Sequence, residues 1–291
     1  MTGHASMPVG VARRLFVLQL GAERVGKTLS VPGAGPGNYW EPLLAVVVET
    51  DVGWVLLDTG MSRAAFESER IAYTYGAAPD GRALDTTPWH LGPTPPASPG
   101  WSWILEGEPL ITGLASVGLT CSDLALAAVS HLHVDHSGGI PTLTSAGVPV
   151  VIGADELAFA RSGAVSEPEG FHPPDWTDPA TDWRLVDADT EIAPGVAVLA
   201  TPGHTPGHLS FAVRLAHSGL WIFCADAADL GQNLLDAVPC GSSTPDTAAA
   251  RDQSVASAAR LREFSRAGAR VVPGHDPVIA AIIRHPDGGH R

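Results

Sequence analysis

Three imidazoles and one carboxylate occur within six consecutive residues of this chain, in the run His131-Leu132-His133-Val134-Asp135-His136. Polar and charged side chains resist burial unless they are paired or bind a metal. A solvent-exposed polar loop is the simple alternative for this run. Against it stand three more ligand-type residues, each of which follows an apolar run and lies in or beside a Gly- or Pro-rich loop: His204, Asp226 and His275. Together these residues predict a metal-dependent hydrolase.

The spacing within the first cluster has a geometric explanation. Residues 124–130 are apolar enough to form a buried strand. Alternate residues of an extended segment point the same way, so His131 and His133 can converge on one ion. Asp135 and His136 then turn toward a neighbouring position. The following Gly138-Gly139 pair is expected to let the backbone bend sharply before a helix begins.

The apolar periodicity predicts a mixed α/β protein with two sheets. Turn residues and apolar runs alternate along most of the chain, and one long helix pattern stops before a glycine. Strands are predicted over 13–20, 43–50, 53–58, 125–130, 148–152, 184–187, 196–200, 209–215, 220–225 and 270–272, and helices over 62–70, 138–146, 154–161 and 248–267.

These motifs resemble the metallo-β-lactamase superfamily, whose signature is His-x-His-x-Asp-His followed by a later His, Asp and His. The resemblance extends from Leu57-Asp58-Thr59-Gly60 to His275. It implies a four-layer αβ/βα sandwich, formed as a single domain over residues 1–291. Residues 1–10 and 284–291 are expected to be flexible tails.

The resemblance also implies a role for each matched residue. Two Zn²⁺ ions are expected, although Fe, Mn or Co suits similar ligands. Asp58 resembles an acidic support beneath the site, and His208 is expected to support the site or pack near it rather than bind a metal. By the same resemblance the first zinc takes His131, His133 and His204, the second takes Asp135, His136 and His275, and Asp226 bridges the two.

Within the superfamily the chain is most similar to the N-acyl-homoserine lactonases, which open the lactone ring of bacterial quorum-sensing signals. The segments that carry this similarity are 130–139, 201–208 and 226–238. Such enzymes commonly have a Tyr three positions after the bridging Asp, whereas this chain has Asp229, which becomes a candidate substrate contact. The implied reaction is attack of a metal-bridging hydroxide on the lactone carbonyl, with Asp135 passing a proton to the leaving alkoxide.

Other activities fit the same signature less well. A thioester hydrolase of the glyoxalase II kind is the main alternative, but it usually has an added C-terminal helical region, and few residues follow His275 here. One branch of β-lactam hydrolases has Cys where this chain has Asp226. A catalytically silent protein that only binds a metal or ligand is a third reading, against which the complete ligand set argues.

Residues 73–110 are rich in proline and tryptophan and are expected to form an insertion resembling a lid. Trp89, Trp101 and Trp103 in this segment are candidates for contacts with an acyl or ring substrate. The alternative is that these side chains anchor a surface insertion or an oligomer contact.

Residues 21–28 match the phosphate-binding loop formula, and the match is expected to be accidental. The mechanism requires a helix beginning at Lys27-Thr28 so that backbone amides face phosphate. The residues that follow contain Pro32 and several glycines, which cannot continue a helix. An N-terminal hairpin is predicted instead.

The net charge of −14 argues against a nucleic-acid partner, because phosphate binding depends on clustered Lys and Arg. Three cysteines imply no disulfide framework, so a reducing cytoplasm is the expected location. No apolar run approaches the ~20 residues of a membrane span. A small-molecule lactone is therefore the expected partner, and a homodimer is one candidate for the oligomeric state.

Overall fold

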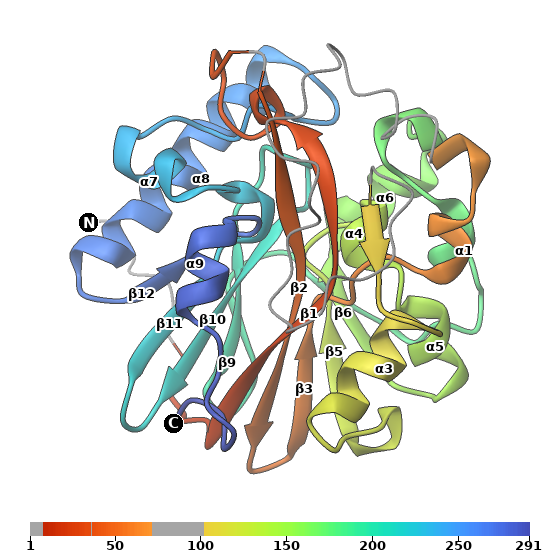
Figure 1. Cartoon of the computed structure of the whole chain (residues 1–291), viewed down its shortest axis with the longest axis vertical. Helices are drawn as coiled ribbons and strands as arrows, with labels where there is room; N and C mark the ends of the chain where they lie inside the picture. The colour runs from red at the N-terminus through yellow and green to blue at the C-terminus, as the bar shows by residue number, and fades with distance from the viewer. Residues whose placement is uncertain (1–7, 36, 72–101) are drawn as a thin grey trace.

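The computed structural model describes residues 8–35, 37–71 and 102–291 (Figure 1). Within these residues the strands form two sheets. The seven-stranded sheet has the order β4 (Ser102–Ile104), β1 (Arg14–Gly26), β2 (Asn38–Thr50), β3 (Gly53–Leu57), β5 (Leu124–Ala128), β6 (Val150–Gly153) and β7 (Trp183–Val186). The five-stranded sheet has the order β12 (Arg270–Val272), β11 (Gly219–Phe223), β10 (Leu209–Leu215), β9 (Val196–Ala200) and β8 (Thr190–Ala193).

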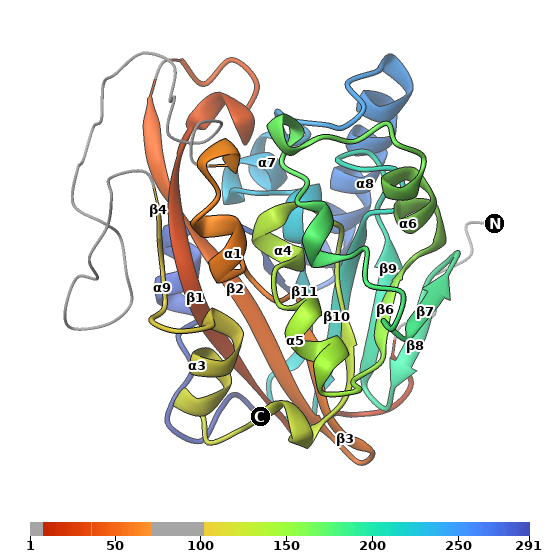
Figure 2. The same ribbon diagram turned by 90° about the vertical axis from the view of Figure 1, so that its right-hand side faces the viewer.

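Helices cover the outer faces of both sheets, which gives four layers (Figures 1 and 2). Helices α1 (Arg63–Phe66), α3 (Pro109–Ser116), α4 (Val134–Ser137), α5 (Ile140–Ser145) and α6 (Ala154–Arg161) lie on the side of the larger sheet, and α7 (Gly231–Asp236) and α8 (Ala248–Arg266) on the other. The short helix α9 (Pro277–Ile282) contacts β2 and packs against the core between the two sheets. The arrangement confirms the predicted sandwich. None of the described helices is long and apolar enough to cross a membrane.

The alternation of side chains along β1 explains why this strand is apolar on both faces. Leu15 and Val17 pack between the two sheets, whereas Phe16, Leu18 and Leu20 pack against the helices of the larger sheet. A strand covered on both faces is expected to be a nearly continuous apolar run. β1 therefore contributes side chains to two hydrophobic cores. One lies between the two sheets, and the other lies between the larger sheet and its helices.

The strands β1 and β2 are longer than predicted. They pair antiparallel from Arg14↔Glu49 to Gly26↔Asn38, with a register irregularity between Gln19 and Gly21. The phosphate-loop match at residues 21–28 thus lies on the strand and a short 3-10 turn, Lys27–Leu29, in agreement with the predicted hairpin.

Several predicted boundaries differ from the structure. The helix expected over 62–70 ends at Phe66 in α1. The one expected over 138–146 is α5, which begins at Ile140 and ends at Ser145, and α4 precedes it in a segment where no helix was predicted. By contrast, α6 occupies the predicted 154–161, and α8 ends one residue before its predicted end. Periodicity predicts these two helices, whereas the bounds of the shorter helices depend on the contacts of the loops around them.

Two predicted peripheral segments are more ordered than expected. Within the segment expected to resemble a lid, residues 102–104 form edge strand β4, paired with β1, and α3 begins at Pro109; residues 72–101 lie outside the described residues. Near the C-terminus, His290 exchanges two backbone hydrogen bonds with Leu15, so residues 284–291 do not form a free tail.

Candidate metal centre

Four loops, each following a strand, bring the seven predicted metal ligands together. All seven side chains are buried. His131, His133, Asp135 and His136 follow β5, His204 follows β9, Asp226 follows β11, and His275 follows β12. Because β5 belongs to one sheet and the other three strands to the second, the site depends on the packing of the two sheets. The seven residues form two groups of potential ligands, and we call these residues the floor of the site.

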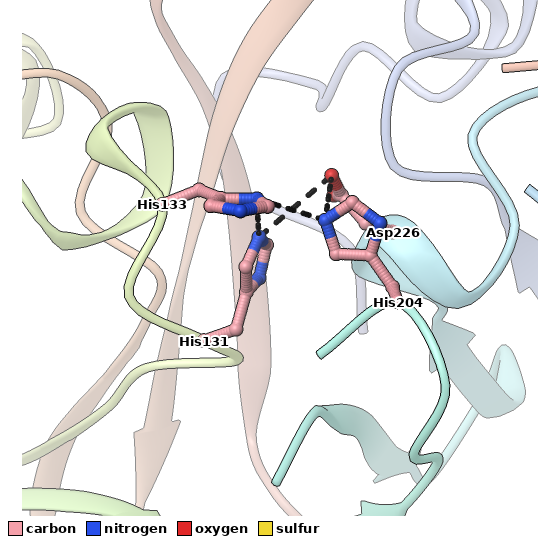
Figure 3. Close-up of side chains that lie close together, drawn as sticks. All are labelled: His131, His133, His204 and Asp226. Atoms are coloured by element: carbon pink, nitrogen blue, oxygen red, sulfur yellow. Dashed lines mark hydrogen bonds and ion pairs between the residues drawn. The ribbon is translucent and has the colours of Figure 1, made fainter. Parts of the chain in front are cut away.

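The first group consists of three histidines and one oxygen of Asp226 (Figure 3). The Nδ1 atom of His133 lies 3.0 Å from Nε2 of His131 and 2.8 Å from Nε2 of His204. The Oδ2 atom of Asp226 lies 3.3 Å from the same His204 nitrogen. Three imidazole nitrogens and a carboxylate oxygen therefore converge on one small volume.

The second group consists of Asp135, His136 and His275. The Oδ2 atom of Asp135 lies 3.1 Å from Nε2 of His136 and 3.6 Å from Nε2 of His275. The Oδ1 atom of Asp226 completes the arrangement, at 2.9 Å from the His136 nitrogen and 3.0 Å from that of His275. Asp226 thus directs one oxygen at each group, which is the geometry of a bridging carboxylate.

The hydrogen bonds of the outer ring nitrogens show that the inner nitrogens fit a metal. Nδ1 of His204 lies 3.2 Å from the Ser242 carbonyl, and Nδ1 of His275 lies 3.1 Å from the Pro42 carbonyl. A carbonyl only accepts, so both Nδ1 atoms carry a proton, and in the neutral form of each ring the Nε2 atom presents a lone pair. In that form the lone pairs and the Asp226 carboxylate face a common volume that a cation can occupy. The donor set of imidazole nitrogen and carboxylate oxygen suits Zn²⁺ and similar ions.

The charges at the floor lead to the same conclusion. Burial, with the neighbouring His136, holds the pKa of His131 well below its usual value, so this ring is in the neutral form that binds metals. Burial acts in the same direction on His136, but nearby carboxylates, with Asp135 foremost, outweigh it and raise the pKa of His136 well above its usual value. The second group therefore has surplus negative charge that a divalent cation can balance.

Asp58 holds the second group from below. Its Oδ2 atom accepts a hydrogen bond from Nδ1 of His136 at 3.0 Å, and its Oδ1 atom accepts one from the backbone N–H of Ser130 at 2.7 Å. Asp58 has a left-handed backbone, with φ of 56°, immediately after β3. This contact fixes which nitrogen of His136 carries the proton and directs the other toward Asp226.

His208 contacts Asp226 through the backbone. Its Nε2 atom accepts a hydrogen bond from the Asp226 N–H at 3.2 Å, while its Nδ1 atom lies 2.9 Å from the hydroxyl of Thr201. His208 belongs to neither ligand group. It holds the turn that carries the bridging carboxylate.

The glycines after the first motif serve a purpose different from the predicted one. Gly138 and Gly139 have φ of −59° and −83°, so neither needs the conformational freedom of glycine for a bend. Instead, a Cβ atom on Gly138 would lie 2.0 Å from the backbone nitrogen of Ser62. The two glycines permit close approach between the motif and the segment that follows Asp58.

Glu156, at the start of α6, is a residue that the sequence analysis missed. Its side chain is fully buried and accepts hydrogen bonds from the backbone N–H of Leu132 and from that of Gly207, each at 3.1 Å. Burial raises its pKa to about 7, although both hydrogen bonds act in the opposite direction. Glu156 joins the loop of His131 to the loop of His204. A lone glutamate in a helix carries no recognisable motif, so only the structure identifies it.

A cavity of about 410 Å³ opens above the floor. Asp135, His204 and His275 reach its surface, and Asp229 lines it too. Trp103 does not line this cavity: it is buried on β4 beside Ala22 and Trp40, which corrects the prediction of a substrate contact. The positions of Trp89 and Trp101 lie outside the described residues.

Comparisons with known proteins agree with this geometry. The chain is 30% identical over 205 residues to an N-acyl homoserine lactonase of Bacillus cereus, and the aligned segment covers 70% of this chain and 71% of the relative. It is 28% identical over 236 residues to an N-acyl homoserine lactonase of Bacillus thuringiensis, covering 81% of each chain. Over 186 residues, it is 33% identical to the N-acyl homoserine lactonase AttM of Azorhizobium caulinodans, covering 61% of this chain and 67% of the relative.

Solved structures share the fold. An N-acyl homoserine lactone hydrolase with the product N-hexanoyl-L-homoserine bound at its catalytic metal centre superposes with a TM-score of 0.71 at 24% identity, covering 91% of this chain and 94% of the other. A dizinc quorum-quenching lactonase superposes with a TM-score of 0.62 at 17% identity, covering 93% and 92%. The family model of the metallo-beta-lactamase superfamily matches residues 39–275, and the chain therefore belongs to this superfamily.

Proposed function

We propose that the protein is a hydrolase that opens lactones, with N-acyl homoserine lactones as the substrate class, at a centre of two Zn²⁺ ions. The observation that supports this most is the Asp226 carboxylate, which directs one oxygen at each ligand group at the bottom of a substrate-sized cavity. The similarity to curated lactonases supplies the substrate class. A bacterial quorum-sensing signal is the natural molecule of this kind.

In this proposal the seven floor residues hold the two metals. His131, His133 and His204 hold the first, Asp135, His136 and His275 hold the second, and Asp226 bridges them. When bound, the ions would supply a water of lowered pKa and a positive charge for the oxyanion that develops at the carbonyl. Asp58 and His208 orient this ligand set through the contacts described above.

We assign to Asp135 the transfer of the proton. Its carboxylate lines the cavity beside both ligand groups. Burial raises the pKa of Asp135, but His136 outweighs burial and lowers it below its usual value, so the group is ionised at neutral pH. Asp135 therefore accepts the proton released from water and passes it to the ring oxygen as the C–O bond breaks.

The ligands come from loops of both sheets, which supports the proposal that residues 1–291 form a single domain. A thioester hydrolase is not favoured, because the curated relatives are lactonases. The choice of Zn²⁺ is also part of the proposal, because Fe, Mn and Co bind to similar ligands.

The test combines metal analysis with an assay of acid release. Purified protein is loaded with Zn²⁺, its metal content is measured by elemental analysis, and a pH indicator follows hydrolysis of hexanoyl and decanoyl homoserine lactones. A thioester and a β-lactam serve as comparison substrates. We expect two metals per chain and acid release with the lactones above all. Two bound metals without hydrolysis of any lactone would reject the proposed function.

A further inference from the structure

The wall of the cavity contains three buried carboxyl groups that the metal ligand groups do not use. Glu23 lies on β1, Glu41 lies on β2, and Asp229 follows the turn that carries Asp226. All three line the cavity, and their exposed fractions are 2%, 7% and 4%. We call these three residues the acidic wall. Among the described residues they do not form a third cluster of close metal ligands.

The two strands place Glu23 and Glu41 directly opposite each other. Like charges in this arrangement destabilise a sheet, and buried charges are costly without a partner. The hydroxyl of Tyr39 donates a hydrogen bond of 2.8 Å to Oε2 of Glu41, which offsets only part of this cost. Burial first, and then the negative charges of Asp135 and Glu41, raise the pKa of Glu23 well above its usual value. His275 of the floor acts in the opposite direction on both carboxyl groups, but it does not outweigh burial.

Two oxygen atoms of the acidic wall have no hydrogen-bond partner among the described residues. They are Oε2 of Glu23 and Oδ1 of Asp229, and both are buried. The other oxygen of Asp229 is fixed, because it accepts a hydrogen bond of 3.1 Å from the thiol of Cys240. Unpartnered buried acceptors are rare in folded proteins, since each costs roughly 1–3 kcal/mol. Because both residues line the cavity, a ligand bound there can donate hydrogen bonds to them.

The protein supplies little positive charge of its own to this wall. Arg24 is the one arginine or lysine among the described residues that line the cavity, and within the described chain it forms no ion pair with any carboxylate. Its Nε atom is itself a buried donor without a partner among the described residues, so Arg24 does not satisfy the unpartnered oxygen of Glu23. A bound molecule can supply the donor that this oxygen lacks.

We propose that the acidic wall is a subsite for a protonated amine, and that the preferred substrate is a lactone that carries such a group. An ammonium group has three donors and no acceptor, and its hydrogen bonds to carboxylates are charge-assisted. An ammonium also stabilises the ionised form of these carboxyl groups, which burial disfavours, whereas a neutral amide has fewer donors and brings no charge. The inference rests on the proposed lactone hydrolysis and specifies which lactones the site selects.

The main test compares matched substrates on the zinc-loaded enzyme. N-(ω-aminoacyl) homoserine lactones with spacers of increasing length are each paired with the lactone that has a methyl group in place of the ammonium. We expect the amine to raise kcat/KM by about tenfold or more at one spacer length at least. A preference for the methyl partner at every length would overturn the proposal.

Isosteric variants test whether the acidic wall causes the preference for the amine-bearing lactones. Glu23→Gln and Asp229→Asn replace a carboxyl group that can ionise by an amide of similar shape, and we expect each to reduce the amine preference to less than about twofold with two metals still bound. Glu169→Gln is the matched control, because Glu169 also lines the cavity but is solvent-exposed. This control should retain the preference. A preference that survives both wall variants would contradict the assignment.

A binding experiment separates this inference from the proposed function. If the two-metal protein hydrolysed no lactone, calorimetry with hexylammonium and with 1-hexanol would still test the wall. We expect hexylammonium to bind more tightly, and Glu23→Gln to weaken it about tenfold. Equal affinity for the two probes, or ammonium binding that Glu23→Gln leaves unchanged, would reject the subsite.

Discussion

The floor of the cavity and the acidic wall beside it are both rich in buried polar groups, but their internal contacts differ. On the floor, the outer nitrogens of His204 and His275 donate to carbonyls, and Asp58 orients His136. On the wall, Glu23 and Asp229 each keep an oxygen without a partner in the described chain. Hydrogen bonds within the protein orient the floor residues toward the proposed metals. The wall, in contrast, has acceptor atoms that we propose a ligand satisfies.

This difference indicates which property each region controls. Contacts that orient ligands govern metal affinity and turnover, because a bound ion needs a fixed geometry. Unbalanced charge governs which molecules enter, because a substrate with the right donors gains free energy there. Substitutions in the two regions should therefore affect different measurements.

The largest effect is expected from Asp226→Asn on the floor. Asparagine keeps the shape but loses the charge and one acceptor, so it cannot bridge two cations as the carboxylate does. We expect the metal content to fall below two per chain and turnover to fall by about 10³ or more. Elemental analysis and lactone kinetics measure both. A fully active variant with two metals would show that the bridge is dispensable.

A smaller loss is expected from Asp135→Asn, which tests proton transfer. We expect much of the metal to remain and turnover to fall by about 10² or more, because the amide cannot accept and return a proton. The measurement is kcat together with metal content. Near-normal turnover in a fully metallated variant would reject the role of Asp135.

Glu156→Gln tests whether the contact between the two ligand loops matters. The amide has only one oxygen, so either Leu132 or Gly207 loses its acceptor. We expect metal affinity to fall by about tenfold, measured by competition with a chelator. Asp155→Asn, on the same helix but exposed, is the matched control and should bind metal normally. Equal affinity in both variants would remove Glu156 from the set of residues that position the floor.

The smallest effect is a gain in stability from Glu23→Gln on the wall. Removing one of two opposed buried carboxyls should raise the free energy of unfolding by about 1 kcal/mol in the enzyme without substrate, measured by urea unfolding. The matched control is Glu49→Gln on β2, which breaks an ion pair with Arg14 and should not stabilise. A destabilised Glu23→Gln variant would show that the wall is balanced within the protein.

The same variant also tests how the stability of the folded protein changes with pH. The pKa of Glu23 is raised in the folded protein, so the unfolded chain releases this proton at lower pH than the folded chain does. The parent therefore loses stability as pH rises above the ordinary glutamate value of about 4.3. The difference in free energy of unfolding between Glu23→Gln and the parent should therefore increase as pH rises over that range. A difference that does not change with pH would contradict this prediction.

Local sequence patterns predicted the elements whose formation depends mainly on local spacing. The helix α6 and most of α8 follow from periodicity, and the motif at His131 identified four floor residues through their spacing. The opposition of Glu23 and Glu41 could not be predicted in this way. It depends on the register of two strands beyond an irregularity, and glycine and charged residues interrupt the apolar pattern there. The contacts of Glu156 are likewise tertiary.

The register irregularity between Gln19 and Gly21 divides β1 into two halves with different surroundings. Residues before Gln19 pack into the sandwich, and residues after Gly21 pair with β4 and carry Glu23. Residues 23–26 of the outer half line the cavity, so one strand both supports the sandwich and forms part of the surface that a ligand meets.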